Sequence, residues 1–82
     1  TEVQEHSFDI IYRPTNQVVE LVFYERENRN IHLTDINGRK ISRVQSAENN
    51  VRLSLMGSSK GLYIISVVQN DGRFISKKMM VY

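Results

Sequence analysis

The chain has 82 residues, with 11 basic and 9 acidic side chains, a net charge of +2 and no cysteine. A chain this short buries only about 60 to 65% of its unfolded surface, so we expect one domain and no large internal active-site cavity. Because the chain has no cysteine, it holds no disulfide and no thiolate metal site. Its small positive net charge does not indicate a nucleic-acid partner. No apolar run approaches the roughly 18 residues that span a bilayer, so no membrane insertion is expected.

The start of the sequence contains no strand pattern. It begins at Thr1 without Met or an apolar signal segment, which indicates a mature form or an excised piece. Residues 1–6 are expected to be flexible, and residues 7–82 to form a single domain. In this domain "SFDIIY" predicts a first strand over residues 7–12, and Pro14 marks the connection after it, because proline supplies no donor to a sheet.

Alternating apolar residues predict the next three strands. "VVELVFYE" predicts a strand from residue 18, with alternate residues facing the core. "RENRN", residues 26–30, indicates a charged turn. "NIHLTDI" and "KISRVQS" then predict strands over residues 30–36 and 40–46.

The Asn37–Gly38 pair lies between these two strands and predicts a β-hairpin with a type I′ turn, which needs positive φ at both residues. Asp35 is expected to support the turn through hydrogen bonds from its side chain to the backbone. A structural role is therefore the first interpretation of this polar cluster.

Three more strands complete the pattern. "VRLSL" predicts a strand over residues 51–55, and the most hydrophobic segment, residues 62–68, predicts a central strand. The closing segment, residues 73–82, carries Lys77 and Lys78, which are charges that protect an exposed sheet edge from pairing with other chains.

Short strands separated by turn signals predict an all-β protein, a small antiparallel sandwich or barrel, and we favour the sandwich. Phe8, Phe23 and Tyr63 are expected in its core, whereas Tyr24 and Tyr82 are expected outside it. An exposed aromatic face that stacks on sugars is the alternative use of these rings, and the core role is favoured.

The polar residues do not form a pattern that indicates catalysis. His6 and His32 lack a further ligand at metal-binding spacing, and the serines lack a nucleophile elbow. Asp9, Asp35 and Asp71 could form paired carboxylates, but two of them lie in turn motifs. The sequence therefore predicts no catalytic residue, no cofactor and no metal site.

From residue 29 onward, the sequence follows a longer pattern: an apolar strand ending in D-x-x-G-[RK], a short alternating strand, a G-x-Y segment, a [DN]-G turn and a K-K strand. The matching residues are Asp35, Gly38 and Arg39, then Val51, Leu53 and Leu55, then Gly61, Leu62, Tyr63, Ile64 and Ile65, then Asp71 and Gly72, and finally Lys77 and Lys78. In this order the chain resembles the type A C-terminal sorting domain of the bacterial type IX secretion system.

The N-terminal third departs from this family pattern. Family members usually open with Y-P-N-P, whereas this chain has "YRPTNQ", which keeps Tyr12, Pro14 and Asn16 in a different order. Two functions therefore stay open. One is a C-terminal sorting module that directs a cargo protein through type IX secretion, and the other is a small stand-alone exported β-sandwich that binds a protein or carbohydrate partner.

The resemblance implies an immunoglobulin-like sandwich of about seven strands without enzymatic activity. It implies export to the periplasm, recognition by the outer-membrane secretion machinery, and delivery to the cell surface or the medium. We hypothesise that Lys77 and Lys78 form the recognised surface, at an end shaped by Gly61 and by the turn containing Asp71 and Gly72. Because small sandwiches expose strand edges, a monomer or an edge-paired dimer is expected.

Overall fold

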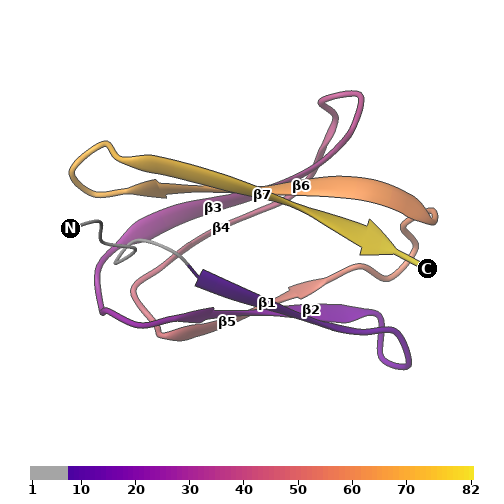
Figure 1. Cartoon of the computed structure of the whole chain (residues 1–82), viewed down its shortest axis with the longest axis horizontal. Coiled ribbons are helices and arrows are strands. Elements are labelled where there is room, and N and C mark those ends of the chain that lie inside the picture. Colours follow the sequence, from indigo (N-terminus) through magenta and orange to yellow (C-terminus); the bar gives the residue numbers. More distant parts are fainter. Residues whose placement is uncertain (1–7) are drawn as a thin grey trace, which may run out of the picture.

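The computed structural model describes residues 8–82, which form seven strands and no helix (Figure 1). The strands are β1 (Phe8–Arg13), β2 (Val18–Phe23), β3 (Arg29–Asp35), β4 (Lys40–Ser46), β5 (Asn50–Ser54), β6 (Gly61–Gln69) and β7 (Phe74–Val81). The segment 1–6 that was expected to be flexible, with His6, lies outside the described residues, as does Ser7. Over the described range, no helix is long and apolar enough to cross a membrane.

Two antiparallel sheets pack face to face, as Figure 1 shows. Sheet A has three strands in the order β1-β2-β5, and sheet B has four in the order β4-β3-β6-β7. Hairpins join β1 to β2, β3 to β4 and β6 to β7, while the other connections cross from one sheet to the other. This arrangement is an immunoglobulin-like β-sandwich, and it confirms the predicted fold class.

One continuous hydrophobic core fills the space between the sheets, because apolar residues alternate along the strands and face inward. The largest fully buried side chains come from both sheets: Phe8, Val19, Leu21, Ile31, Leu33, Leu55, Ile65 and Val67. Phe23 and Tyr63 are each 5% exposed, so the predicted aromatic core is confirmed. Tyr24 and Tyr82 are 65% and 71% exposed and lie outside the core, as predicted.

The positions of the last two strands also agree with the sequence. β6 lies inside sheet B between β3 and β7, and its inward residues are buried while its outward residues are half-buried. Within residues 8–82, β7 is an edge strand of sheet B, with β6 as its one hydrogen-bonded neighbour. The hydrophobic strand is therefore central, and the strand with the two lysines is at an edge.

The charged segment "RENRN" is not a turn throughout, because Arg29 is the first residue of β3 and is only 3% exposed. Its guanidinium donates to the backbone carbonyl of Glu25 and, at 3.4 Å, to that of Glu48. It also lies 3.9 Å from the centroid of the Phe23 ring. These contacts offset part of the cost of burying the charge, and burial lowers the pKa of Arg29.

The β3–β4 hairpin has a three-residue loop, so the predicted type I′ turn is wrong. The N–H of Asp35 donates to the carbonyl of Arg39, and the N–H of Gly38 donates to the carbonyl of Asp35, each at 3.0 Å. Gly38 has a φ of +85°. Among the described residues other than glycine, a positive φ occurs at Gln17, in the β1–β2 turn, and not at Asn37. Asn37 therefore lacks the conformation that type I′ requires, and Gly38 supplies the left-handed residue of a longer loop.

The connections gather at the two ends of the sandwich (Figure 1). The β1–β2 turn, the β3–β4 loop and the β5–β6 connection lie at the end where β7 finishes. The β2–β3 and β4–β5 connections and the β6–β7 turn lie at the opposite end. This division determines which of the motif residues can share a surface.

Candidate functional site

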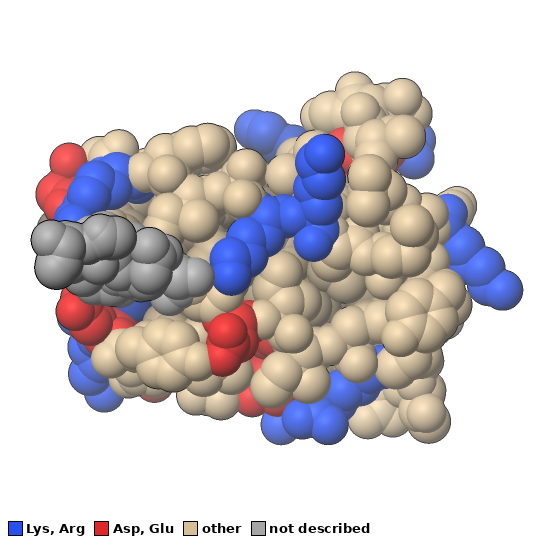
Figure 2. Space-filling model, viewed as in Figure 1, with Lys and Arg blue, Asp and Glu red and all other residues tan. Residues whose placement is uncertain are grey.

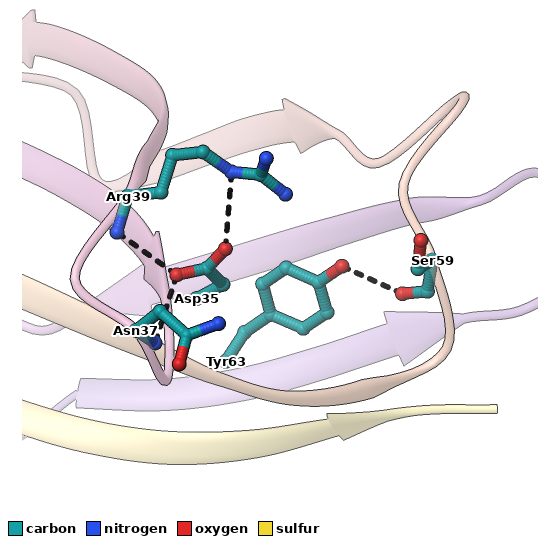
Figure 3. Close-up of polar contacts among 5 residues, drawn as sticks. All are labelled: Asp35, Asn37, Arg39, Ser59 and Tyr63. Carbon is teal, nitrogen blue, oxygen red and sulfur yellow. Dashed lines mark hydrogen bonds and ion pairs between the residues drawn. The ribbon is translucent and has the colours of Figure 1, made fainter.

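Asp35 organises the β3–β4 loop. Its Oδ1 accepts hydrogen bonds from the backbone N–H groups of Asn37 at 2.9 Å and Arg39 at 2.8 Å, and its Oδ2 accepts one from Nε of Arg39 at 3.2 Å (Figure 3). The backbone N–H of Arg39 is the main reason why the pKa of Asp35 is lowered. The Asp35 side chain is only 13% exposed, whereas that of Arg39 is 78% exposed. The predicted supporting role of Asp35 is confirmed, and the Arg39 guanidinium faces solvent.

A hollow of about 210 Å³ lies between this loop and the β5–β6 connection. Tyr63 pairs with Asp35 across β6 and β3, and its hydroxyl donates to the carbonyl of Ser59 at 2.6 Å. Figure 3 shows the Tyr63 ring between the Asp35 carboxylate and Ser59. The hollow is lined by Asp35, Ile36, Asn37, Arg39, Ser59, Lys60, Gly61, Leu62 and Tyr63. The fold thus brings Asp35, Arg39, Gly61 and Tyr63 of the family motif together.

Two lining residues, Ser59 and Lys60, were missed by the sequence analysis. Both are exposed in the β5–β6 connection, and Lys60 adds a second basic side chain to the lining beside Arg39. The one signal in the sequence is the small polar segment before Gly61, which is typical of a compact connection. The hollow therefore has two basic residues, Arg39 and Lys60, in its lining.

The Asp71–Gly72 turn lies at the other end of the molecule. Gly61 pairs with Val81 where β7 finishes, whereas Asp71 and Gly72 join the far ends of β6 and β7. β6 has nine residues, so the two sites are separated by roughly 27 Å of strand. In the turn, Asp71 accepts the backbone N–H of Arg73 at 3.0 Å. The hypothesis that Gly61 and this turn shape one end is therefore corrected.

The side chains of Lys77 and Lys78 leave β7 in opposite directions, because successive residues of a strand face opposite sides. Lys77 is half-buried, donates to the carbonyl of Phe8, and lies 5.0 Å from the centroid of the Phe8 ring. Lys78 is exposed on the outer face, where it pairs with Ile64. Figure 2 shows basic side chains over β7 and acidic ones over β1. Lys77 therefore joins the two sheets, and Lys78 is the lysine that faces outward.

Among residues 8–82, no group of three or more His, Asp and Glu side chains could hold a metal ion. The three carboxylates considered as an acid–base pair have separate partners: Asp9 accepts the Tyr24 hydroxyl, Asp35 holds its own loop, and Asp71 pairs with Arg73.

The family model of the secretion system C-terminal sorting domain matches residues 11–82. The chain belongs to this family. Domains of the family are C-terminal sorting signals of the type IX secretion system. The match begins before Tyr12, so the segment "YRPTNQ" lies within the family despite its different order.

No curated protein matches the chain. Among solved structures, it is similar to PorZ, described as an essential bacterial surface component of the type IX secretion system of Porphyromonas gingivalis. The TM-score is 0.76 at 14% sequence identity, and the match covers 92% of this chain and 11% of PorZ. At this identity the similarity shows the fold alone.

Proposed function

We propose that this domain directs an attached cargo protein through the type IX secretion system and is recognised, already folded, by the outer-membrane secretion machinery. The family match supports the sorting role. We assign the domain no catalytic activity of its own. On this proposal it passes through the periplasm and reaches the cell surface or the medium with its cargo.

The observation that carries the proposal is the position of β7 at the edge of sheet B. An edge strand presents backbone N–H and C=O groups with which a receptor strand can pair. Lys78 places an exposed positive charge beside this edge, and Lys77 fixes the strand against Phe8. We therefore assign Lys78 to receptor contact and Lys77 to positioning of the strand.

The hollow lies near the end of the same strand. Gly61 lines the hollow and pairs with Val81, so a receptor on β7 could also reach Arg39 and Lys60. The motif residues Asp35 and Arg39 would then support recognition by shaping this end of the domain.

The test fuses residues 1–82 behind a reporter that is targeted to the periplasm. Reporter at the surface and in the medium is compared between a host with type IX secretion and its secretion-null mutant. We expect export only in the competent host. Retention of the reporter in the periplasm of both hosts, with the domain shown to be folded, would overturn the sorting function.

The role of the edge strand is tested in the same assay. Lys78→Glu should reduce export several-fold, because it places a negative charge where the receptor meets a positive one. The matched control is Arg26→Glu, which makes the same charge change at an exposed position in the β2–β3 connection. Equal export of both variants would remove Lys78 from the recognised surface.

A further inference from the structure

The described strands of sheet B present exposed cations and no carboxylate on the outer face. The structure describes β3, β4, β6 and β7 completely, and their one acidic residue is Asp35, whose side chain is held in the β3–β4 loop. Lys40, Arg43 and Lys78 are exposed on β4 and β7, the two edge strands of the sheet. This face therefore has a positive charge that nothing within its own strands neutralises.

The strand register places these cations on both sides of an uncharged centre. In one row across the sheet, Lys40 pairs with Thr34, Thr34 with Ile64, and Ile64 with Lys78. Since neighbouring strands are about 4.8 Å apart, the backbones of the two lysines are separated by roughly 14 Å. Arg43 lies on the same face, one outward position further along β4.

Exposed apolar side chains lie on the same face. Phe74 and Met80 are 63% and 53% exposed at the two ends of β7. They pair with Val68 and Leu62 of β6, which are half-buried. The face thus combines apolar contacts along one edge with cations at both edges.

Sheet A provides an internal comparison, because its outer charges have partners within the chain. Glu20 is 8% exposed and accepts hydrogen bonds from Asn50 at 2.7 Å and from Arg13 at 3.3 Å. Asp9 accepts the hydroxyl of Tyr24. Arg13 and Arg52 lie beside Glu20, so basic and acidic side chains occur together on the outer face of sheet A, in contrast with the outer face of sheet B.

We propose that the outer face of sheet B docks an acidic segment of a protein partner. Carboxylates of the partner would lie against Lys40, Arg43 and Lys78, and its apolar side chains against Phe74 and Met80. This inference rests on the proposed function, because it names the chemistry of the surface that recognises the domain. It also extends the contact from the β7 edge across the sheet to β4.

An anionic membrane is the competing occupant, and the geometry favours a protein. Phe74 and Met80 are about 20 Å apart along β7, so they form no single apolar wedge for insertion into lipid. The cations are likewise spread along two edges, which suits carboxylates that are spaced along a folded or extended chain.

The first test measures binding in solution by nuclear magnetic resonance. A synthetic peptide of alternating glutamate and valine is the probe, and a lysine–valine peptide is its charge-reversed control. Amide signals on the outer face of sheet B should shift with the acidic peptide, and its affinity should fall as salt is added. Shifts spread evenly over both sheets would overturn the proposal.

Two double variants with the same change in net charge make the test specific. Lys40→Glu with Arg43→Glu alters the face far from β7 and should weaken peptide binding at least roughly tenfold. Arg26→Glu with Arg52→Glu alters exposed residues of the β2–β3 connection and of sheet A, and should weaken it less than about threefold. Because Arg52 lies opposite Glu20, circular dichroism first verifies that this control variant is folded. Equal losses, or tighter binding to phosphatidylglycerol vesicles than to the peptide, would overturn the proposal.

The export assay separates this inference from the function on which it rests. If the wild-type fusion is not exported by the competent host, the sorting function itself fails. If the wild-type fusion is exported and the variant with Lys40→Glu and Arg43→Glu is exported equally well, the function stands and the docking face fails. We expect export of the wild type and of the control variant, and a several-fold loss for the variant on β4.

Discussion

The ammonium group of Lys77 joins the last strand to the first, since it donates to the backbone carbonyl of Phe8 and lies 5.0 Å from the centroid of the Phe8 ring. A second contact follows further along, where the Tyr12 hydroxyl donates to the carbonyl of Tyr82 at 3.1 Å and the two rings meet edge to face at 5.3 Å. The first contact bridges β1 and β7, which are edge strands of different sheets, and the second joins β1 to Tyr82, the residue that follows β7. They therefore hold the proposed recognition strand in place.

Replacing Lys77 should weaken the contact between β1 and β7. Lys77→Ala removes a hydrogen bond, a cation–π contact and the packing of the aliphatic stem, so the free energy of unfolding should fall by about 1–2 kcal/mol. Lys78→Ala, its exposed neighbour, should change it by less than about 0.5 kcal/mol. Urea denaturation followed by circular dichroism measures both. Similar losses for the two variants would show that the contact with Phe8 contributes nothing.

Two replacements of Asp35 separate its hydrogen bonds from its charge. Asp35→Ala removes the three hydrogen bonds that the Asp35 side chain accepts in the loop and should lower the midpoint of thermal unfolding by roughly 5 °C. Asp35→Asn keeps an oxygen that can accept the N–H groups of Asn37 and Arg39, and should recover more than half of the loss. Thermal unfolding by circular dichroism compares them. If the Asp35→Asn variant unfolds at as low a temperature as the Asp35→Ala variant, the charge of Asp35, and not its hydrogen bonds to the loop, stabilises the hairpin.

The features that could be predicted from the sequence are those that depend on residues close to one another along the chain. Val51, Leu53 and Leu55 alternate with polar residues, and all three are buried, since the side chains of a strand alternate by necessity. Asp35 was also predictable as a support of its turn, because its partners lie within four residues. Arg29 was not predictable, since its burial depends on carbonyls from two separate connections, at Glu25 and Glu48.

The candidate site was predictable only in pieces. The sequence identifies Asp35 and Tyr63 as motif residues, but their meeting depends on the pairing of β3 with β6, which are not neighbours in the chain. Similarly, the period of a strand sends Lys77 and Lys78 to opposite sides, but only the packing of the two sheets brings Lys77 to Phe8. Contacts between distant segments are therefore the part that the structure adds.

The stability of the domain should depend on pH through Glu20. Hydrogen bonds from Asn50 first, and from Arg13 second, lower the pKa of Glu20 below its usual value. A carboxyl with a lower pKa in the folded state stabilises the fold above its unfolded pKa of about 4.3. This stabilisation is lost as the pH falls through the folded pKa.

Glu20→Gln should therefore be less stable than the wild type at neutral pH, and the difference should shrink as the pH falls below about 4. Glu48→Gln, at an exposed position in the β4–β5 connection, is the control and should differ little from the wild type at either pH. Urea midpoints across this pH range measure the effect. A difference for Glu20→Gln that stays constant with pH would contradict the role of its charge.

Gln17 offers a site where the domain can be stabilised. Among residues 8–82 it is the one non-glycine residue with positive φ, at +55°, and its carbonyl accepts the N–H of Leu55 at 2.8 Å. The left-handed conformation costs a non-glycine residue about 1–2 kcal/mol, so Gln17→Gly should raise the free energy of unfolding by about 0.5–1 kcal/mol, after the entropy of glycine in the unfolded chain is counted. Thr15→Gly, in the same turn but without positive φ, should lower it by a similar amount. Urea denaturation compares the two variants, and a loss of stability in both would show that Gln17 is not strained.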